Sequence, residues 1–435
     1  MEIILGEVRE SFKSGKTRSL EWRKKQLTAL INLIQDNEQK LSKALFHDLG
    51  KHPAEAYRDE IGCPISLVFF PAKGELQPEP LGVILIFSCW NFPISLALDP
   101  LIGAISAGNA VVLKPSDQAP ACSSVLANLI PLYMDSKAIQ VIEGGPQICE
   151  KILLHKWDKI FFTGSAQIGR IVMTAAAKHL TPVTLELGGK CPTILDSLST
   201  TSDLKVAVKR IAGAKWGPCS GQACIAVDYL LVEANFAPTV IEMLKKTIKR
   251  FYGEKPIESK SLARIVNQRH FERLTGFLKD PLVAASIIHD PPLDAAIMNE
   301  EIFGPFLPII TLNKIEESIE FIKSRPKPLT IYAFTKDEKF KRRILSETSS
   351  GTVMFNDFLC DTLPFGGVDQ SGFGRYHGKY SFDTFSHEKA IMQGSFLIEI
   401  EPRYPPWTDF KMKFIRLAYR LNYFGILLLL LGLKK

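Results

Sequence analysis

Cys224 is the residue whose setting most favours chemistry. It follows Gly221, Gln222 and Ala223 and precedes an apolar, β-branched stretch that is typical of a strand. A thiol held on small residues leaves room for a planar electrophile to approach, as attack by a thiolate requires. A buried structural cysteine is the competing interpretation, and Cys219 is the next candidate nucleophile.

Glu186 is a candidate general base. It lies between Leu185 and Leu187 at the end of a predicted strand, and two glycines follow. Apolar neighbours raise the pKa of a carboxyl group by desolvation, which suits a base that works near neutral pH. A salt-bridged glutamate at a domain hinge is the other interpretation.

Two polar side chains follow predicted strands nearer the N-terminus. Asn91 lies in the sequence SCWNFP, residues 88–93, directly after a strongly apolar run, and Lys114 ends the next strand. Doubly wound sheets bind ligands at these carboxyl ends. Asn91 could donate its amide to a developing oxyanion, or could simply form a turn before proline. Lys114 could meet a ribose or a phosphate.

Residues 161–169, FFTGSAQIG, predict a strand end, a tight turn and a helix start. Free amides at such a start, together with the Ser165 hydroxyl, can hold a phosphate. Gly164 and Gly169 do not form the G-x-G-x-x-G fingerprint, so an ordinary helix cap remains the alternative.

Two glycine-containing turns, residues 299–305 and 363–368, each carry one phenylalanine. Such turns usually only redirect the chain. Alternatively, Glu301 accepts hydrogen bonds from a ribose, while Phe303 and Phe365 form the walls of an apolar slot.

Alternating strand and helix patterns position these residues. They predict a doubly wound parallel α/β sheet, followed after Gly189 by a second α/β domain that carries Cys224. The predicted strands are residues 81–87, 110–113, 139–142, 159–162, 183–185, 229–232, 307–310 and 329–334, and the predicted helices are residues 20–49, 94–106, 121–132, 168–179, 204–214 and 237–251. The first of these helices is expected to bury one face and to stop at Gly50.

Composition excludes several classes of protein. The 53 basic residues are scattered among 46 acidic ones, giving a net charge of +7 without a long basic block, so we expect no nucleic-acid partner. Eight irregularly spaced cysteines indicate neither a disulfide framework nor a zinc site. Residues 1–9 lack a secretory leader. These features favour a cytoplasmic, globular protein without a structural metal.

The C-terminal run from Phe424 to Leu433 is apolar throughout and is preceded by basic residues. It is shorter than the roughly 20 residues that a spanning helix needs. Two interpretations stay open: peripheral contact with an anionic membrane, or packing along a subunit interface.

Taken together, the motifs resemble the aldehyde dehydrogenases, and the resemblance spans roughly residues 8 to 395. The chain is similar to the class 3 branch, which oxidises fatty and other aldehydes, and to its plant-type members. Seven signatures carry the family resemblance in order, and they are residues 90–93, 114–116, 162–165, 185–190, 221–224, 301–305 and 364–367.

The resemblance implies a mechanism. Cys224 would attack the aldehyde carbon, and the Asn91 amide would hold the oxyanion together with the Cys224 backbone amide. Glu186 would then activate the water that hydrolyses the thioester. The product is a carboxylate, and medium- or long-chain aliphatic aldehydes are the implied substrates.

The resemblance also implies a nicotinamide cofactor, NAD or NADP. Gly164, Ser165 and Gly169 would lie near its pyrophosphate, Lys114 at the adenine ribose, and Trp90 nearby. Glu301 and Phe303 would meet the nicotinamide ribose and ring. We expect residues 1–187 to form the cofactor domain, residues 188–380 the catalytic domain, and residues 381–435 the oligomerisation segment of a homodimer.

Three stretches are shorter than the family pattern: those between Gly62 and Phe70, between Ile288 and Leu293, and between Asn356 and Leu363. They motivate an alternative function. In it the chain is a shortened or silent paralogue that retains the fold for a structural or binding role.

Overall fold

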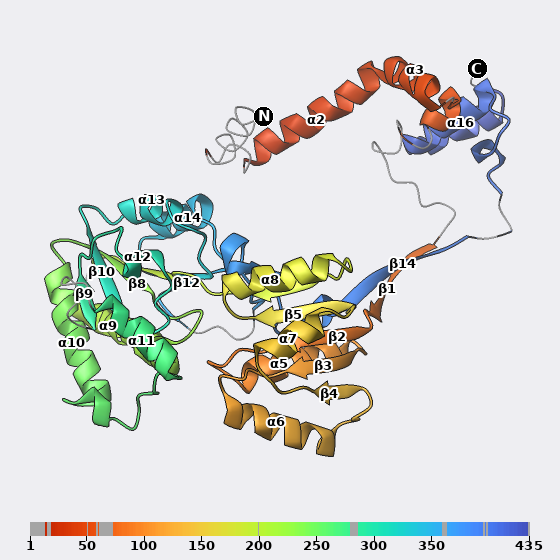
Figure 1. Cartoon of the computed structure of the whole chain (residues 1–435). Coiled ribbons are helices and arrows are strands. Elements are labelled where there is room, and N and C mark those ends of the chain that lie inside the picture. Colours follow the sequence, from red (N-terminus) through yellow and green to blue (C-terminus); the bar gives the residue numbers. More distant parts are fainter. Residues whose placement is uncertain are drawn as a thin grey trace. The chain divides into compact units, whose positions relative to one another are not determined.

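The computed structural model describes residues 14, 19–49, 51–57, 60, 73–198, 200–278, 286–358, 363–394, 396 and 399–433. Contacts within the chain divide it into two compact units. One unit comprises residues 78–388, and the other combines residues 1–77 with residues 389–435. Figure 1 labels the elements of both units.

The first sheet lies in the unit of residues 78–388. Among the described residues it has six strands, which are β2 (Val83–Phe87), β3 (Ala110–Lys114), β4 (Ile139–Val141), β5 (Lys159–Thr163), β6 (Val183–Glu186) and β13 (Gly372–Phe373). Their order is β13-β6-β5-β2-β3-β4, and only the β13–β6 pairing is antiparallel. The chain runs outward from β2 to β4 and then returns to β5 on the other side of β2. Strand order therefore reverses between β2 and β5, where open α/β sheets bind ligands.

Helices cover both faces of this sheet, as expected for the doubly wound class. Ile84 and Ile86 of β2 belong to a core with α5 and α6, whereas Leu85 and Phe87 belong to a core with α7 and α8. This alternation follows from the two-residue period of a strand. The helices are α5 (Ser95–Ser106), α6 (Pro120–Tyr133), α7 (Pro146–Leu153) and α8 (Ala166–Ala177).

A second sheet confirms the predicted second α/β domain. In the described chain it has six strands, which are β7 (Pro192–Leu195), β8 (Tyr229–Glu233), β9 (Ile287–His289), β10 (Leu307–Leu312), β11 (Thr330–Phe334) and β12 (Thr352–Phe355). Their order is β12-β11-β7-β8-β10-β9, and all pairings are parallel. The chain later returns to the first sheet as β13, so sheet membership does not follow one boundary in sequence.

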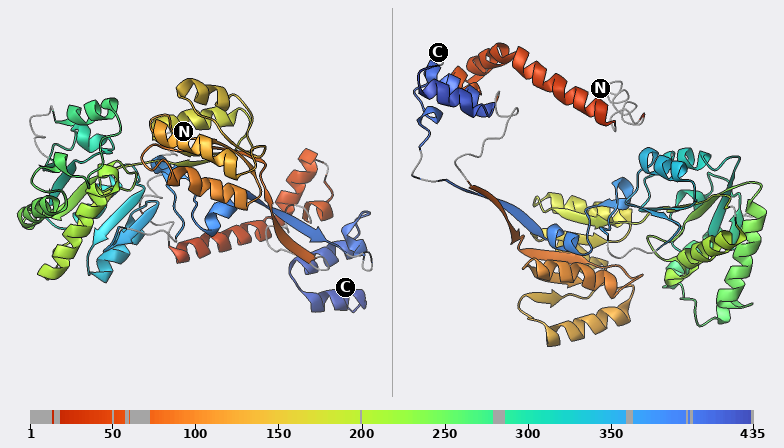
Figure 2. Two further views of the ribbon diagram at one scale, coloured as in Figure 1. Left: turned by 90° about the horizontal axis from the view of Figure 1, so that it is seen from below. Right: turned by 180° about the vertical axis from the view of Figure 1, so that it is seen from behind.

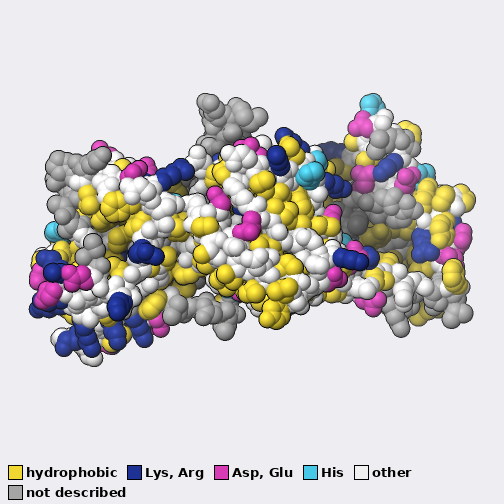
Figure 3. Space-filling model, turned by 60° about the horizontal axis from the view of Figure 1, so that its bottom comes forward, with side chains coloured by type: hydrophobic (Ala, Val, Ile, Leu, Met, Phe, Trp, Pro, Cys, Tyr) yellow, Lys and Arg dark blue, Asp and Glu magenta, His cyan; other side chains and the backbone are white. Residues whose placement is uncertain are grey.

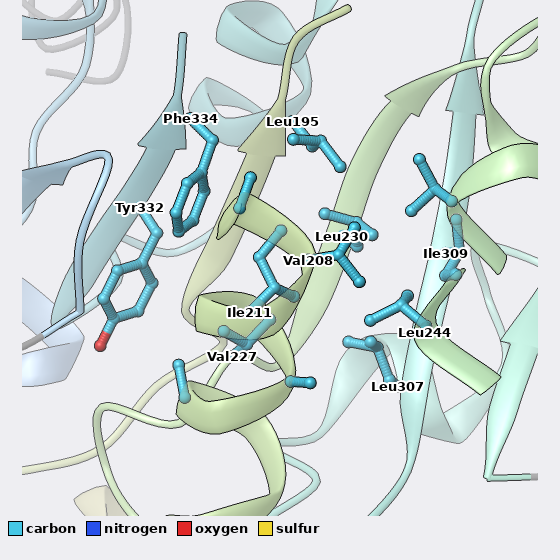
Figure 4. Packing of buried hydrophobic residues seen from close by; sticks show 14 of the residues in the cluster. Leu195, Val208, Ile211, Val227, Leu230, Leu244, Leu307, Ile309, Tyr332 and Phe334 are labelled. Atoms are coloured by element: carbon cyan, nitrogen blue, oxygen red, sulfur yellow. The ribbon is translucent and has the colours of Figure 1, made fainter. Parts of the chain in front are cut away.

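Apolar side chains pack on both faces of the second sheet. On one face, Val208 and Ile211 of α9 and Leu244 of α10 pack against Leu230 and Ile309 of the strands (Figure 4). Burying each such aliphatic side chain stabilises the folded state by about 1.5–3 kcal/mol relative to leaving it exposed. The helices on the two faces are α9 (Thr201–Trp216), α10 (Ala237–Tyr252), α11 (Gln268–Phe277), α12 (Ala296–Asn299), α13 (Glu317–Lys323) and α14 (Glu338–Glu347).

The other unit is built from helices around a small core that includes Tyr57 and Ile415. Its helices are α2 (Leu20–Asp36), α3 (Glu38–Leu49), α4 (Pro53–Ala56), α16 (Asp409–Tyr419) and α17 (Tyr423–Leu430). The prediction of one helix with a buried face over residues 20–49 is wrong in two respects. Asn37 ends α2 by donating both its backbone amide and its side-chain amide to the Leu33 carbonyl, and α2 buries no residue. Gly50 lies outside the described residues.

The C-terminal apolar run forms α17, an eight-residue helix. No helix in the described chain combines the length and the apolar content needed to cross a membrane. Phe424, Leu427 and Leu430 of α17 are exposed.

Strands β1 (Lys73–Pro80) and β14 (Ser386–Gln393) form a two-stranded sheet, and they run side by side in both views of Figure 2. We did not predict either strand, because their side chains are mainly polar and β1 contains two prolines. Proline is tolerated on such edge strands.

Candidate active site

The candidate residues gather where the two sheets approach each other. Asn91, Gly164 and Glu186 lie at or just beyond the carboxyl ends of β2, β5 and β6, whereas Cys224 and Glu301 precede β8 and β10. The carboxyl groups of Glu186 and Glu301 both lie close enough to Cys224 to raise the pKa of its thiol. The structure thus brings together residues that are widely separated in sequence.

The turn before Cys224 depends on glycine. Gly221 has a φ of +80°, and a Cβ there would lie 2.5 Å from the Gly304 carbonyl oxygen and 2.9 Å from that of Lys215. Only glycine tolerates both the backbone conformation and this approach. The turn therefore packs directly against the segment that follows Glu301.

Two side chains hold the backbone of the Cys224 loop through hydrogen bonds to its carbonyl groups. The Cys191 thiol donates to the Cys224 carbonyl at 3.3 Å, and the Tyr332 hydroxyl donates to the Ile225 carbonyl at 2.6 Å. Cys191 and Tyr332 are almost fully buried. Sequence reasoning missed both, because each lies on another strand or its edge and belongs to no local motif.

Burial is the main cause that raises the pKa of the Cys224 thiol, and the Glu301 and Glu186 carboxyl groups add to it. The Cys224 backbone amide acts in the opposite direction by hydrogen bonding to the sulfur. The resting group is therefore a thiol, which needs a base to become the reactive thiolate.

Glu186 is buried, with a side chain only 4% exposed. Within the part of the chain that the structure describes, neither of its carboxyl oxygens has a hydrogen-bond partner. Desolvation raises the pKa of this group well above the ordinary value of 4.5, which confirms the elevation expected from its apolar neighbours. The alternative of a salt-bridged hinge glutamate is wrong, because no cation contacts Glu186 among the described residues.

Asn91 and Trp90 follow β2 at the reversal of strand order. Asn91 is buried, and its Oδ1 atom has no hydrogen-bond partner in the described parts of the chain. The Trp90 ring lies 5.2 Å from the Phe303 ring and 4.9 Å from the His270 ring. These aromatic contacts join the Asn91 segment to the Glu301 loop.

The start of α8 is a capped helix N-terminus, which is the alternative to a phosphate-binding turn. The Ser165 hydroxyl caps the helix by accepting from the Ile168 amide at 3.4 Å. The Gly164 amide donates to the Glu186 carbonyl at 3.0 Å. This bond links the turn before α8 to the backbone of the candidate base.

Gly169 lies within α8 and Lys114 ends β3, and both are buried. A Cβ at Gly169 would lie 2.9 Å from the Leu187 side chain, so α8 packs closely on the chain that leaves β6. The Lys114 ammonium donates to the Pro115 carbonyl at 2.6 Å. Lys114 therefore lies two strands from β5, and its ammonium bonds within its own turn.

Glu301 packs against the chain that follows Glu186. Its Oε1 atom accepts from the Gly189 amide at 3.0 Å, and a Cβ at Gly188 would lie 2.3 Å from the same oxygen. Burial raises the pKa of Glu301 to about 8, while the Gly189 amide lowers it. Phe303 adopts a φ of +46°, a strained conformation for a bulky residue.

Sequence reasoning assigned no role to Lys190, Asp228 or Arg273, which contact the Glu301 loop. A charged residue just before a buried strand is a usable signal for Lys190 and Asp228. Nothing in the sequence singles out Arg273, since charged residues are common on surface helices.

Comparisons with known proteins agree with this geometry. The sequence pattern of the aldehyde dehydrogenase family matches residues 2–285 and 279–391. Aldehyde dehydrogenase family 3 member F1 of Arabidopsis thaliana is 57% identical over 477 aligned positions, which cover 100% of this chain and 99% of the relative. The dimeric NADP-preferring aldehyde dehydrogenase of Rattus norvegicus is 42% identical and covers 92% of this chain and 96% of its own length.

The fold matches as well. The substrate-bound structure of Staphylococcus aureus AldH superposes with a TM-score of 0.76 at 37% identity, covering 96% of this chain and 99% of that chain.

The alignments also bear on the three short stretches. Since 477 aligned positions face 435 residues, at least 42 positions of the Arabidopsis relative have no counterpart. The two family matches meet at residues 279–285, ahead of the stretch between Ile288 and Leu293. Residues 279–285, 61–72 and 359–362 lie outside the described chain. The match on both sides of these positions shows that the chain belongs to the aldehyde dehydrogenase family, in its class 3 branch, and is an NAD(P)-dependent oxidoreductase.

Proposed function

We propose that the protein oxidises medium- and long-chain aliphatic aldehydes to carboxylic acids, with Cys224 as nucleophile and Glu186 as general base. One observation carries this proposal. The buried Glu186 carboxyl group has no hydrogen-bond partner among the described residues, and it lies close enough to Cys224 to raise the pKa of its thiol. Covalent catalysis through cysteine needs a base in the neighbourhood of the nucleophile, and these observations support that role for Glu186.

In this proposal the residues around α8 hold the cofactor. The backbone near Gly164, the Ser165 hydroxyl and the start of α8 receive the pyrophosphate, and Gly169 allows the close approach of the helix. Lys114 binds the adenine ribose and Glu301 binds the nicotinamide ribose. Trp90 and Phe303 lie beside the nicotinamide ring. When bound, the nicotinamide supplies the hydride acceptor.

Cys224 begins the chemistry by losing its proton to Glu186, which releases it to solvent, and the sulfur then forms a bond to the aldehyde carbon. The carbonyl oxygen becomes an oxyanion, which accepts hydrogen bonds from the Asn91 side-chain amide and the Cys224 backbone amide. Donors that are already in place contribute about 3 kcal/mol each to such a transition state. Oxidation of this thiohemiacetal gives a thioester on Cys224.

Glu186 completes the reaction in its deprotonated form. It takes a proton from a water molecule, whose oxygen attacks the thioester carbon. The carbon–sulfur bond breaks, the carboxylic acid leaves, and the Cys224 sulfur is released as a thiolate, which takes back a proton from Glu186. The apolar surroundings of Glu186 favour the transfer because they raise the proton affinity of the base.

Purified full-length protein assayed with hexanal and with NAD or NADP tests this function. We expect reduced cofactor to form with at least one nicotinamide, and more efficiently for hexanal and longer aldehydes than for acetaldehyde. Folded protein that leaves every aldehyde unchanged would refute the proposal. The same experiment decides between NAD, which we favour as cofactor, and the NADP named for the rat relative.

We also propose a role for each of the three predicted parts of the chain. Residues 1–187 bind the cofactor, and residues 188–380 carry the nucleophile. Residues 381–435 support a homodimer. The rat relative is named dimeric. Outside that segment, exposed large apolar side chains among residues 78–380 supply further surface that a second copy can bury. Figure 3 shows hydrophobic side chains across one face of the molecule, and α6 exposes Leu129, Leu132 and Tyr133. Light scattering coupled to gel filtration measures the oligomeric state.

A silent paralogue with a structural role is the second candidate function. It is favoured by the 42 or more relative positions that have no counterpart in this chain. Thermal melting with and without NAD separates the two functions. A cofactor at 100 times its dissociation constant should stabilise the protein by about 2.7 kcal/mol, and an unchanged melting temperature would favour the silent paralogue.

For the C-terminal tail we propose two exclusive roles in a cytoplasmic protein. The exposed apolar residues of α17 either pack at a subunit interface or, with the basic residues of α16, lie on an anionic membrane. Deletion after Tyr423 should dissociate dimers in the first case. In the second case it should abolish sedimentation with anionic vesicles.

A further inference from the structure

The segment from Glu300 to Phe306 has no regular secondary structure. Its backbone cannot use a helix or sheet ladder, so its polar groups need other partners. Lys190, Asp228 and Arg273 supply them from the β6–β7 connection, the residue before β8, and α11. We call these three residues the Glu301 clamp.

Lys190 and Asp228 form the first half of the clamp. The Lys190 ammonium donates to the carbonyls of Ile297 and Glu300, both at 2.8 Å, and pairs with one oxygen of Asp228. The other Asp228 oxygen accepts from the Ile302 amide at 2.9 Å. Both charged side chains are largely buried. One ion pair therefore holds the chain on both sides of Glu301.

Arg273 forms the second half. Its Nη2 atom donates to the Ile302 carbonyl at 2.7 Å and, more weakly, to that of Phe303 at 3.5 Å, while Nη1 lies 3.4 Å from the Glu301 carbonyl. The guanidinium group also lies over the Phe277 ring at 5.6 Å. A planar, multidentate donor restricts the orientation of the carbonyls that it contacts.

The clamp acts on a side chain that is itself anchored. The Glu301 carboxyl group accepts from the Gly189 amide, one residue before Lys190. The chain around Glu301 and the partner of its carboxyl group thus belong to one connected network. Burying charged side chains costs free energy because they lose hydration. Three of them at one short segment therefore indicate a role beyond hydrogen bonding to its backbone.

We propose that Arg273 and the Lys190–Asp228 pair are positioning residues, which hold the Glu301 carboxyl group in the geometry that receives the nicotinamide ribose. This inference rests on the proposed role of Glu301 in cofactor binding. It adds that the cofactor meets a preorganised carboxyl group, so little ordering is needed on binding.

The Arg273→Met variant of the full-length protein tests the proposal. It removes the donors but keeps an apolar side chain that can cover Phe277. The KM for the nicotinamide cofactor should rise about ten-fold, in the range caused by a misplacement of up to about 1 Å, while the KM for hexanal stays within two-fold. The rate of Cys224 alkylation by iodoacetamide without cofactor should not change.

Arg325→Met is the matched control. Arg325 donates to the Met298 carbonyl at 2.7 Å and lies over the Phe321 ring at 4.7 Å, but it does not contact residues 300–303. It should lower the melting temperature without changing the KM for the cofactor. Equal changes in cofactor KM for both arginine variants would indicate general destabilisation and overturn the proposal.

A double-variant cycle asks whether Arg273 acts through Glu301. Arg273→Met should add little to the cofactor KM of Glu301→Gln if both changes remove the same contact. Independent, multiplicative effects would overturn the inference. If Arg273→Met does not fold, the combined Lys190→Met and Asp228→Asn variant decides, because it removes both charges of the pair together and should raise the cofactor KM equally.

Failure of the inference differs from failure of the proposed function. If the unaltered protein neither oxidises hexanal nor is stabilised by NAD or NADP, the function itself is wrong. If the unaltered protein is active and the folded clamp variants keep its cofactor KM, only the positioning role is wrong.

Discussion

Glu186 is buried and Glu301 is half-buried, and the two carboxyl groups have opposite hydrogen-bonding surroundings. No described residue forms a hydrogen bond with either oxygen of Glu186, whereas Glu301 accepts from the Gly189 amide and its chain is held by the clamp. Burial raises the pKa of both. The contrast indicates a division of labour, in which a group that must exchange protons is left unpaired and a group that must hold a ligand is fixed.

The largest expected effect comes from replacing Cys224, the proposed nucleophile. Cys224→Ala should reduce aldehyde-dependent formation of reduced cofactor by about 10⁴-fold or more, since the covalent route is lost. Initial rates and thermal melting provide the measurement. Cys219→Ala, which changes a neighbouring thiol outside the proposed mechanism, should keep most activity. Loss of activity in the Cys219 variant alone would move the nucleophile there.

Glu186→Gln tests the unpaired member of the comparison. The amide keeps the shape but cannot accept the proton of water, so thioester hydrolysis should slow by about 10²–10⁴-fold. Rapid mixing should show about one reduced cofactor per active site, followed by almost no turnover. Because Glu186 must lose a proton to act, the steady rate of the unaltered enzyme should rise with pH. An unchanged steady rate in the variant would exclude Glu186 as the base.

Gly188→Ala tests the fixed member. Its Cβ would lie 2.3 Å from a Glu301 oxygen, so the carboxyl group must move and the cofactor KM should rise several-fold, in keeping with the cost of a small misplacement of about 1 Å or less. Gly189→Ala is the neighbouring control, since its Cβ would meet its nearest atom at 3.6 Å. A larger effect at Gly189 than at Gly188 would contradict a fixed position for Glu301.

The smallest effect concerns stability. The pKa of Glu301 rises from 4.5 to about 8 on folding, so the folded state retains a proton that the unfolded state loses. This contribution is complete below about 4.5 and declines as pH rises toward about 8. Urea unfolding of Glu301→Gln across that range should show a shallower loss of stability than the unaltered protein. The stability of the variant should still fall somewhat with pH, because the pKa of Glu186 is also raised. Parallel slopes for the two proteins would show that Glu301 does not titrate in this way.

Most elements of the two sheets were predictable because each depends on a local pattern. Alternating or continuous apolar runs gave β2, β5 and β11, and their observed bounds differ from the predicted ones by at most two residues at either end. Polar strands such as β1 and β14 carry no such pattern. The helix over residues 20–49 was predicted as helical, but the break at Asn37 depends on one side-chain hydrogen bond, and its burial depends on what packs against it.

The sequence by itself determined which residues could react and where the chain turns, since both depend on a residue and its immediate neighbours. Cys224 on its glycine turn and Glu186 between leucines are of this kind. Only the tertiary structure decided that these groups meet Glu301, that Glu186 has no partner, and that Arg273 reaches the Glu301 loop. Proximity through space and the loss of water on burial set these properties, and neither is encoded in any single stretch of the chain.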